Sequence, residues 1–129
     1  MATRQPPFAA DETAADVMLR EPKTLPVDAT VREVRAELDN PHVQMVLLVD
    51  GASFGAAIVE IPPEADPDSP AGAFAWSDVP TISAQAPAAD AFTRTTESPH
   101  RRIVVLDDDR TLLGLLCLNA TRTNFCRKG

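Results

Sequence analysis

The stretch MVLLVD at residues 45–50 and the stretch RIVVLD at residues 102–107 decide the fold. Each contains a run of apolar residues that ends in aspartate, which predicts a strand buried on both faces. The offset that maps Thr24 onto Thr81 also maps residues 46–49 onto residues 103–106. Because these matches keep one register, the sequence predicts a structural unit that occurs twice.

Further elements surround each run in the same order. Thr30-Val-Arg-Glu33 is a capping box followed by apolar residues at helical spacing, which predicts a helix over residues 30–39. A short strand is predicted before it at residues 23–27, and a second apolar run at residues 54–61 predicts a hairpin. In the second copy the predicted elements are a strand at 81–82, a helix at 87–96 and strands at 102–106 and 112–118.

The segment between the two copies is rich in proline. Residues 62–77 hold four prolines, which exclude a long helix there. Within this segment we expect Phe74 and Trp76 to return the chain to the core, at the place that Val17 and Leu19 hold in the first copy.

The sequence predicts an α+β fold in which two pseudo-symmetric repeats pack sheet to sheet as one domain. A half of about 50 residues cannot bury enough apolar area alone, so the two copies have to share a core, with a cleft between equivalent strand ends. The capping-box spacing of Thr13 and Asp16 marks the beginning of the first repeat. The predicted division is an N-terminal lead-in at 1–12, repeat 1 at 13–61, a Pro-rich connection at 62–77, repeat 2 at 78–125 and a tail at 126–129.

Composition limits the partners that the chain can bind. Its 129 residues carry 12 basic and 19 acidic side chains, a net charge of −7, which disfavours nucleic acid and anionic membranes. Residues 1–93 carry 5 basic and 15 acidic side chains, whereas residues 94–129 carry 7 and 4, so an anion site is expected in the C-terminal third. No apolar run reaches the ~18 residues of a membrane span or forms a signal peptide, and a cytoplasmic location is therefore expected.

In its repeated motifs the sequence resembles tandem CBS domains, the cystathionine-β-synthase-type repeats that pair into a Bateman module. The motifs are ADVM at 15–18, KTLPVDATV at 23–31, VLLVD at 46–50 followed by Gly55, VPTI at 79–82, IVVLD at 103–107 and LGLL at 113–116. The resemblance covers residues 13–118. It implies a free-standing regulatory module, because members of this family usually bind adenosyl nucleotides or related anions between the repeats and regulate an enzyme, channel or transporter.

The chain departs from the family's usual ligand-binding pattern. That pattern places a threonine or serine three residues after the strand glycine, and six residues after it an aspartate that takes the ribose hydroxyls. Counted from Gly55 and Gly114, these positions hold Ile58 and Ile61 in the first copy and Cys117 and Ala120 in the second. Both ribose carboxylates are therefore missing.

A candidate anion site remains at His100, Arg101 and Arg102. Paired guanidinium groups can grip a phosphate bidentately, and the first copy has no basic residue at the corresponding place. An alternative interpretation is that the arginines are solvated and offset the charge of the three aspartates at 107–109. The candidate ligand-binding residues are Thr24, Leu25, Thr81, Ile82, His100, Arg101, Arg102 and Cys117.

The sequence gives little support for reactive thiols, metal binding or catalysis. Cys117 and Cys126 are the only cysteines, and because Cys117 lies in an apolar run, a buried reduced thiol is favoured there. His42 and His100 fall at equivalent positions but lack a carboxylate or thiol between them, so no metal site is predicted. No nucleophile, base and orienting residue can be assigned, so neither catalysis nor a cofactor is expected.

Two functions remain open besides a redox or metal-dependent activity, which rests only on the two cysteines and the two histidines. One is a sensor whose cleft binds an adenosyl nucleotide such as AMP, ADP or ATP, or another phosphorylated anion, and passes the signal to an unknown protein partner. The other is a ligand-free structural or dimerisation module that interacts with a protein partner. The resemblance implies a homodimer in which the helices meet. The candidate contacts are Val31, Val34 and Leu38, where the core does not consume them, and Ala88 and Phe92 in the second copy.

Overall fold

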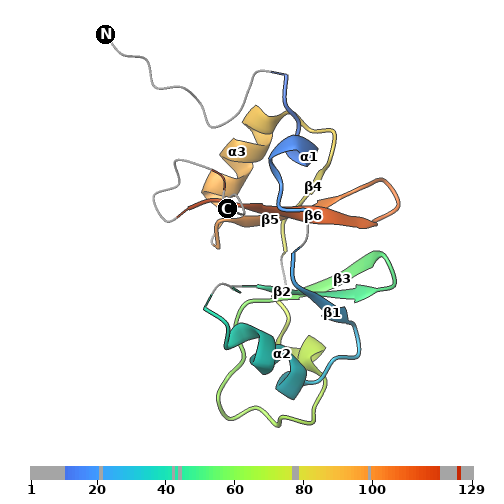
Figure 1. The fold of residues 1–129 in the computed structure, drawn as a ribbon, viewed down its shortest axis with the longest axis vertical. Helices are drawn as coiled ribbons and strands as arrows, with labels where there is room; N and C mark the ends of the chain where they lie inside the picture. The colour runs from blue at the N-terminus through green and yellow to red at the C-terminus, as the bar shows by residue number, and fades with distance from the viewer. Residues whose placement is uncertain are drawn as a thin grey trace. The chain divides into compact units, whose positions relative to one another are not determined.

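The computed structural model describes residues 11–20, 22–41, 43, 45–76, 79–98, 100–119 and 125. It has an α+β fold, and the predicted order of strand, helix, strand and strand occurs in each half (Figure 1). The elements are α1 (Ala14–Val17), β1 (Thr24–Pro26), α2 (Val31–Leu38), β2 (Val46–Asp50), β3 (Ser53–Ile58), the 3-10 helix η1 (Ala71–Phe74), β4 (Thr81–Ser83), α3 (Ala88–Glu97), β5 (Arg102–Leu106) and β6 (Leu112–Cys117).

Two three-stranded sheets form the framework, with the strand orders β1-β2-β3 and β4-β5-β6. In each sheet the short first strand runs parallel to the middle strand, where Thr24 pairs with Leu47 and Thr81 pairs with Val104. The repeat offset relates both members of the first pair to those of the second. The repeat predicted from the sequence is therefore confirmed by the pairing of the backbone.

Each middle strand is buried on both faces. On the helix side, Val46 and Leu48 belong to one apolar cluster and Ile103 and Val105 to another. Side chains alternate along a strand, so Leu47 and Val104 point to the opposite face, and each is at most 1% exposed. Burial on both faces explains why these strands are continuous apolar runs in the sequence.

The chain divides into two compact units that do not coincide with the repeats of the sequence. The β1–β3 unit comprises residues 22–79 and the short segment Asp109–Leu112. The β4–β6 unit groups residues 80–108 and those from 113 onward with residues 11–20. Helix α1, which the sequence places at the beginning of the first repeat, thus belongs to the unit built by the second.

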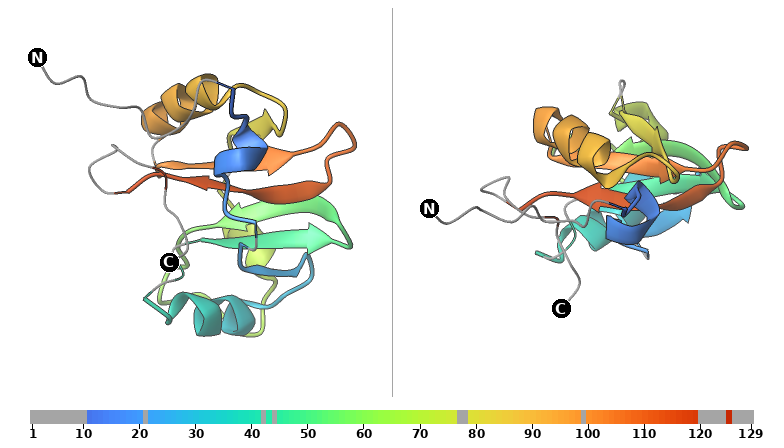
Figure 2. Two further views of the ribbon diagram at one scale, coloured as in Figure 1. Left: turned by 45° about the horizontal axis from the view of Figure 1, so that its top comes forward. Right: turned by 90° about the horizontal axis from the view of Figure 1, so that it is seen from above.

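Backbone hydrogen bonds of α1 and η1 account for this division. Figure 2 shows the blue helix α1 beside the orange and red strands of the β4–β6 unit. The Ala14 N–H donates to the Ala86 carbonyl at 2.8 Å in the β4–β6 unit, and the Ala71 N–H donates to the Ala29 carbonyl at 2.9 Å in the β1–β3 unit. The repeat offset relates these groups as well, because Ala14 corresponds to Ala71 and Ala29 to Ala86. Each short helix therefore packs against the sheet of the other repeat.

The segment that follows each short helix also takes an equivalent place. The Leu19 N–H donates to the Leu115 carbonyl, and the Trp76 N–H donates to the Ala57 carbonyl, both at 2.8 Å. The predicted equivalence of Trp76 and Leu19 is thereby confirmed. Because Leu115 takes the place of Ala57, its neighbour Gly114 corresponds to Ala56 and not to Gly55.

A β-bulge explains why the two strand glycines do not correspond. Leu48 pairs with Ala56 while Val49 pairs with Phe54, which leaves Gly55 as an extra residue between the two pairs. The bulge inserts one residue into β3, and an alignment on the glycines alone is displaced by that residue. Strand β3 also ends at Ile58, before the predicted end at residue 61.

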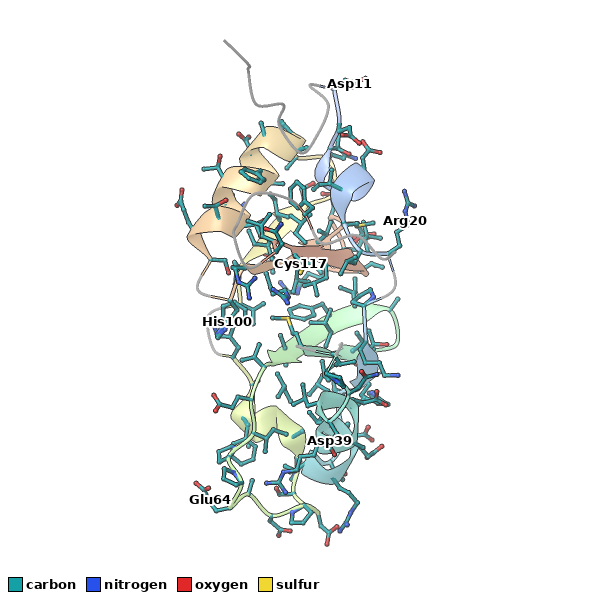
Figure 3. All side chains as sticks on the ribbon, turned by 60° about the vertical axis from the view of Figure 1, so that its left-hand side comes forward. Asp11, Arg20, Asp39, Glu64, His100 and Cys117 are labelled. Atoms are coloured by element: carbon teal, nitrogen blue, oxygen red, sulfur yellow. The ribbon has the colours of Figure 1, made fainter. Side chains whose placement is uncertain are left out.

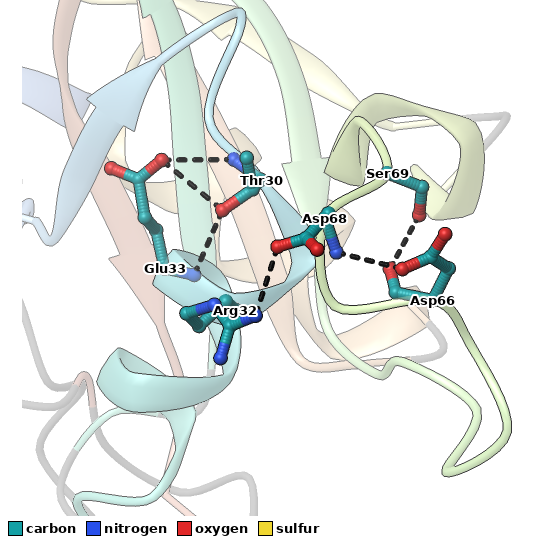
Figure 4. Close-up of polar contacts among 6 residues, drawn as sticks. All are labelled: Thr30, Arg32, Glu33, Asp66, Asp68 and Ser69. Atoms are coloured by element: carbon teal, nitrogen blue, oxygen red, sulfur yellow. Dashed lines mark hydrogen bonds and ion pairs between the residues drawn. The ribbon is translucent and has the colours of Figure 1, made fainter.

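The proline-rich residues 62–70 form a strap along α2 (Figure 4). The Arg35 guanidinium donates to the Pro62 carbonyl at 2.6 Å, and the Arg32 guanidinium pairs with Asp68 at 2.8 Å. Residues 62–75 are all described, and η1 is the one regular element among them. The prediction that the prolines exclude a long helix here is confirmed.

The strap and the capping box together supply hydrogen-bond acceptors for the N–H groups at the N-terminus of α2. The Val31 and Arg32 N–H groups donate at 2.9 Å to the carbonyls of Ser69 and Pro67. The Glu33 N–H donates to the Thr30 hydroxyl, and the Glu33 carboxylate accepts from the Thr30 N–H. The first N–H groups of the helix, which have no intrahelical partners, are therefore bonded.

Thr30→Ala should lower the free energy of unfolding by about 1 kcal/mol, because it removes the side-chain half of this cap. Thr93→Ala is the matched control, since Thr93 is exposed on α3 and its hydroxyl donates within that helix, to the Ala89 carbonyl. Urea denaturation measures both variants. Equal midpoints for the two would contradict a stabilising role of the cap.

Candidate functional site

The structure distributes the predicted ligand-binding residues over both compact units. Thr24 and Leu25 lie on β1 in the β1–β3 unit. The others lie in the β4–β6 unit: Thr81 and Ile82 on β4, His100, Arg101 and Arg102 at the beginning of β5, and Cys117 at the end of β6. Figure 3 labels His100 and Cys117.

Two of the predicted residues contribute to cores. Ile82 is buried in the helix-side cluster of the β4–β6 unit, and Leu25 packs against the corresponding cluster of the β1–β3 unit. Their strand neighbours differ, because Thr24 is exposed and Thr81 is half-buried. Leu25 is half-buried like Thr81, so Thr24 is the one exposed residue among these four.

A tight turn after α3 positions Arg101 and Arg102. The Arg101 N–H donates to the Ser98 carbonyl at 3.1 Å, and the buried Ser98 hydroxyl donates to the Arg102 carbonyl at 2.9 Å. The backbone φ of Arg101 is +56°, in the left-handed region that few residues other than glycine adopt. The turn therefore fixes the backbone from which two adjacent guanidinium groups extend.

Arg102 is buried, with 8% of its surface exposed. Its guanidinium donates to the carbonyls of His100 at 3.0 Å and Arg101 at 3.3 Å. Burial lowers the pKa of the Arg102 guanidinium, and the neighbouring charge of Arg101 lowers that pKa further. The interpretation of Arg102 as a solvated residue is therefore wrong, because the turn at Ser98 draws the first residue of β5 into the unit.

Arg101 is half-buried and is held by Leu118, the residue that follows β6. The Arg101 guanidinium donates to the Leu118 carbonyl, and the Leu118 N–H donates to the Arg101 carbonyl, each at 3.0 Å. Among the residues that the structure describes, no carboxylate forms an ion pair with Arg101. Its guanidinium is thus oriented by a neutral carbonyl, which leaves the positive charge available to an anion.

Cys117 is disulfide-bonded and 4% exposed. Its predicted burial is confirmed, but the prediction of a reduced thiol is wrong. The other cysteine of the sequence, Cys126, lies outside the described residues. The cause of the error is a reversal of the chain after β6, seen in the antiparallel bridge between Leu118 and Phe125, which hydrophobic periodicity does not reveal.

The first-copy positions that lack polar ligand groups face the core of their unit. Ile58 is fully buried in the helix-side cluster, and Ile61 packs against it. In the second copy, Ala120 lies outside the described residues. The β1–β3 unit therefore offers no side-chain acceptor for a ribose at Ile58 or Ile61.

Phe125 is a residue that the sequence analysis did not single out. It is 4% exposed and belongs to the core of the β4–β6 unit. Its ring meets that of Phe92 edge to face, with the centroids 5.6 Å apart and the planes at 80°. The sequence signal that could have indicated its burial is a single aromatic residue in a polar C-terminal segment.

Most of the residues named as dimer contacts pack against other residues of the same chain. Val31 and Val34 are 0% exposed and Ala88 is 1% exposed, so these three pack in the cores of their own units. Leu38 packs against one core, and Phe92 lies against Phe125. Val31 and Val34 are consumed by the core, so the condition for their being dimer contacts is not met. The expectation that Ala88 faces a second copy is wrong, because this apolar face is needed to cover the sheet.

Metal-ligating groups and membrane-spanning helices can be sought in the described part of the chain. There, His, Cys, Asp and Glu side chains form no group of three or more that could hold a metal ion. His42, one of the two histidines, lies outside it. No described helix has both the length and the apolar character needed to span a bilayer.

The fold and its internal repeat define a protein of paired β-α-β-β modules. Residues 71–119 match the family model of the CBS domain. The chain as a whole has the fold of the CBS-pair proteins.

Solved structures agree with this assignment. The CBS domain protein PAE2072 from Pyrobaculum aerophilum, complexed with AMP, is 26% identical with a TM-score of 0.64, and the match covers 81% of this chain and 86% of that chain. The CBS-pair protein CBSX2 from Arabidopsis thaliana is 15% identical with a TM-score of 0.72, covering 82% and 88%. The cytosolic domain of the Mg²⁺ channel MgtE in complex with ATP is 16% identical with a TM-score of 0.67, covering 81% and 45%. A search of the curated proteins finds no match.

Proposed function

We propose that this protein is a regulatory, non-catalytic sensor module that binds a phosphorylated small molecule, foremost an adenosyl nucleotide, through Arg101 and Arg102. The observation that carries the proposal is the pair of adjacent guanidinium groups at the beginning of β5. Both donate to backbone carbonyls, and burial of one of them makes its charge costly. A phosphate bound to this pair would offset that cost.

The comparison with PAE2072 supports an adenosyl nucleotide as the ligand class. That protein is complexed with AMP, and the match extends over most of both chains. A guanidinium pair suits the phosphate of such a ligand, because a planar fork of N–H donors matches two phosphate oxygens. Thr81 and His100, from the same unit, are the further residues that we propose to contact the ligand.

The proposed site depends on phosphate more than on ribose. Ile58 and Ile61 lie in or against a core and supply no acceptor for the ribose hydroxyls. Val59 and Pro62, which correspond to Cys117 and Ala120 once the bulge is counted, have no side-chain acceptor either. Phosphate should therefore contribute most of the affinity, and an unphosphorylated nucleoside should hardly bind.

Isothermal titration calorimetry with AMP, ATP and adenosine tests this proposal. We expect binding of AMP and ATP, little binding of adenosine, and weaker binding of AMP as salt rises, because a half-exposed ion contact is screened over ~8 Å at physiological ionic strength. Adenosine binding as tightly as AMP would show that the affinity does not come from the guanidinium pair. No binding of AMP or ATP would contradict the nucleotide proposal itself.

A second candidate function is a ligand-free structural or dimerisation module with a protein partner. The observation that favours it is the state of Cys117, which is buried and disulfide-bonded at a position where the family pattern has a ligand-binding hydroxyl. Thermal denaturation separates the two functions. A nucleotide at 100 times its Kd should add ~2.7 kcal/mol to the stability of a sensor, whereas the melting temperature of a ligand-free module should not change.

Homodimerisation stays a prediction, with contact residues other than Val31, Val34 and Ala88. Sedimentation velocity at micromolar concentration measures it, and a species of about twice 13.9 kDa is expected. A single species of 13.9 kDa across the concentration range would contradict self-association.

A further inference from the structure

Leu118 connects the proposed anion site with the C-terminal end of the β4–β6 unit. On one side, its N–H and its carbonyl are both bonded to Arg101, at 3.0 Å each. On the other side, it forms an antiparallel bridge with Phe125. The orientation of the Arg101 guanidinium and the position of Phe125 thus depend on the same residue.

Phe125 is anchored by apolar contacts. Its ring is 4% exposed, lies edge to face against Phe92 on α3, and belongs to the same core cluster as Leu118 and Ile103. Loss of this ring would remove the apolar packing of residue 125 and loosen its bridge with Leu118. The Leu118 carbonyl would then be less firmly placed to accept from Arg101.

A bound anion should stabilise the contacts that link Arg101, Leu118 and Phe125. Arg101 and Arg102 are adjacent positive charges, and the charge of Arg101 disfavours the charged form of its neighbour. A bound phosphate compensates this repulsion only while both guanidinium groups stay oriented, and for Arg101 that orientation comes from the Leu118 carbonyl. Anion binding and the Leu118–Phe125 bridge should therefore strengthen one another.

We propose that Phe125 is a positioning residue for the anion site, and that the bridge between Phe125 and Leu118 is the part of the chain that responds to occupancy of this site. The inference rests on the proposed function, because it needs a phosphorylated ligand at Arg101. By thermodynamic linkage the coupling is reciprocal: the factor by which the anchored Phe125 raises affinity is the factor by which the ligand stabilises the anchor.

The coupling is tested with AMP as the probe, on the full chain. Phe125→Ala should weaken AMP binding at least about fivefold, the lower end of typical coupling between sites. Phe74→Ala is the matched control, because it truncates the same side chain where it packs against the core of the other unit. It should leave the affinity for AMP unchanged.

Amide hydrogen exchange of the unaltered protein gives a second readout that does not depend on how a variant folds. AMP should slow exchange of the Leu118 amide, which donates to Arg101, more than exchange of the Val104 amide, which donates to Pro80 in the same unit. Val104 reports the general stabilisation by ligand binding, so the excess at Leu118 measures the local coupling.

The outcomes separate the two proposals. Weaker binding by Phe125→Ala together with excess protection at Leu118 supports the coupling. Equal AMP affinity in the unaltered protein, Phe125→Ala and Phe74→Ala, or equal slowing at Leu118 and Val104, overturns the coupling and leaves the proposed function standing. Absence of AMP binding to the unaltered protein overturns the proposed function and the coupling with it.

Discussion

Gly114→Ala should lower the free energy of unfolding by about 1–3 kcal/mol, the cost of overpacking a closed site. A β-carbon at Gly114 would lie 2.5 Å from the Leu19 carbonyl oxygen and 2.5 Å from the Met18 sulfur. The methionine side chain can move, but the Leu19 peptide cannot, since its N–H and its carbonyl are both bonded to Leu115. The substitution should therefore loosen the segment after α1 from β6.

Gly72→Ala is the control for this prediction. A β-carbon there meets no atom within 4 Å, and Gly72 has no positive φ, so its effect should stay within about 0.5 kcal/mol. Urea denaturation compares the two variants, and limited trypsin digestion at Arg20 reports whether the segment is loosened. Equal stability of both variants would mean that α1 does not depend on close approach to Gly114.

Arg101→Ala should weaken AMP binding by ~1–3 kcal/mol, or about 5- to 150-fold, because it removes one of the two guanidinium groups proposed to hold the phosphate. Arg101 is half-buried, so its truncation should perturb the fold less than truncation of the buried Arg102. Arg102 is better tested as Arg102→Lys. Lysine keeps the charge and loses the planar fork, which should weaken the affinity by a smaller factor.

Arg94→Ala is the matched control for the binding experiment. Arg94 is an exposed arginine of the same unit, and its guanidinium donates to the Thr81 carbonyl from α3. The substitution removes the same charge from the protein and leaves both guanidinium groups of the proposed site in place. Calorimetric Kd values that rise equally for Arg94→Ala and Arg101→Ala would show that AMP responds to net charge and not to a site at Arg101.

Local sequence signals were sufficient for the elements of each repeat. The capping box at Thr30 placed the beginning of α2, and the apolar run before Asp107 placed β5 at the residues observed. Turn and cap residues act within a few positions of the chain, so their effect can be read from one sequence. The repeat offset helped further, because most of the local signals occurred twice.

The errors concern contacts between residues far apart in the sequence, a turn without a sequence marker, and a change of register. The place of α1 against the second sheet depends on Ala86, far along the chain from Ala14. The burial of Arg102 depends on a left-handed turn at Arg101, for which the sequence has no glycine as a marker. The inserted Gly55 displaced the comparison of the two copies by one residue, since a glycine of a bulge and a glycine of a close contact look alike in a sequence.

The reciprocal packing of α1 and η1 has a consequence for how this chain folds. A cut between β3 and η1 would leave each half without the short helix that completes its sheet, so neither of these halves should be an autonomous folding unit. The bond from Ala14 to Ala86 closes a long loop, which raises contact order and slows folding relative to two repeats that each fold from contiguous residues. During synthesis, the sheet of the first repeat should stay incomplete until η1 has been made. Helix α1 should pack later still, because the residues that it contacts, near Ala86, are made after η1.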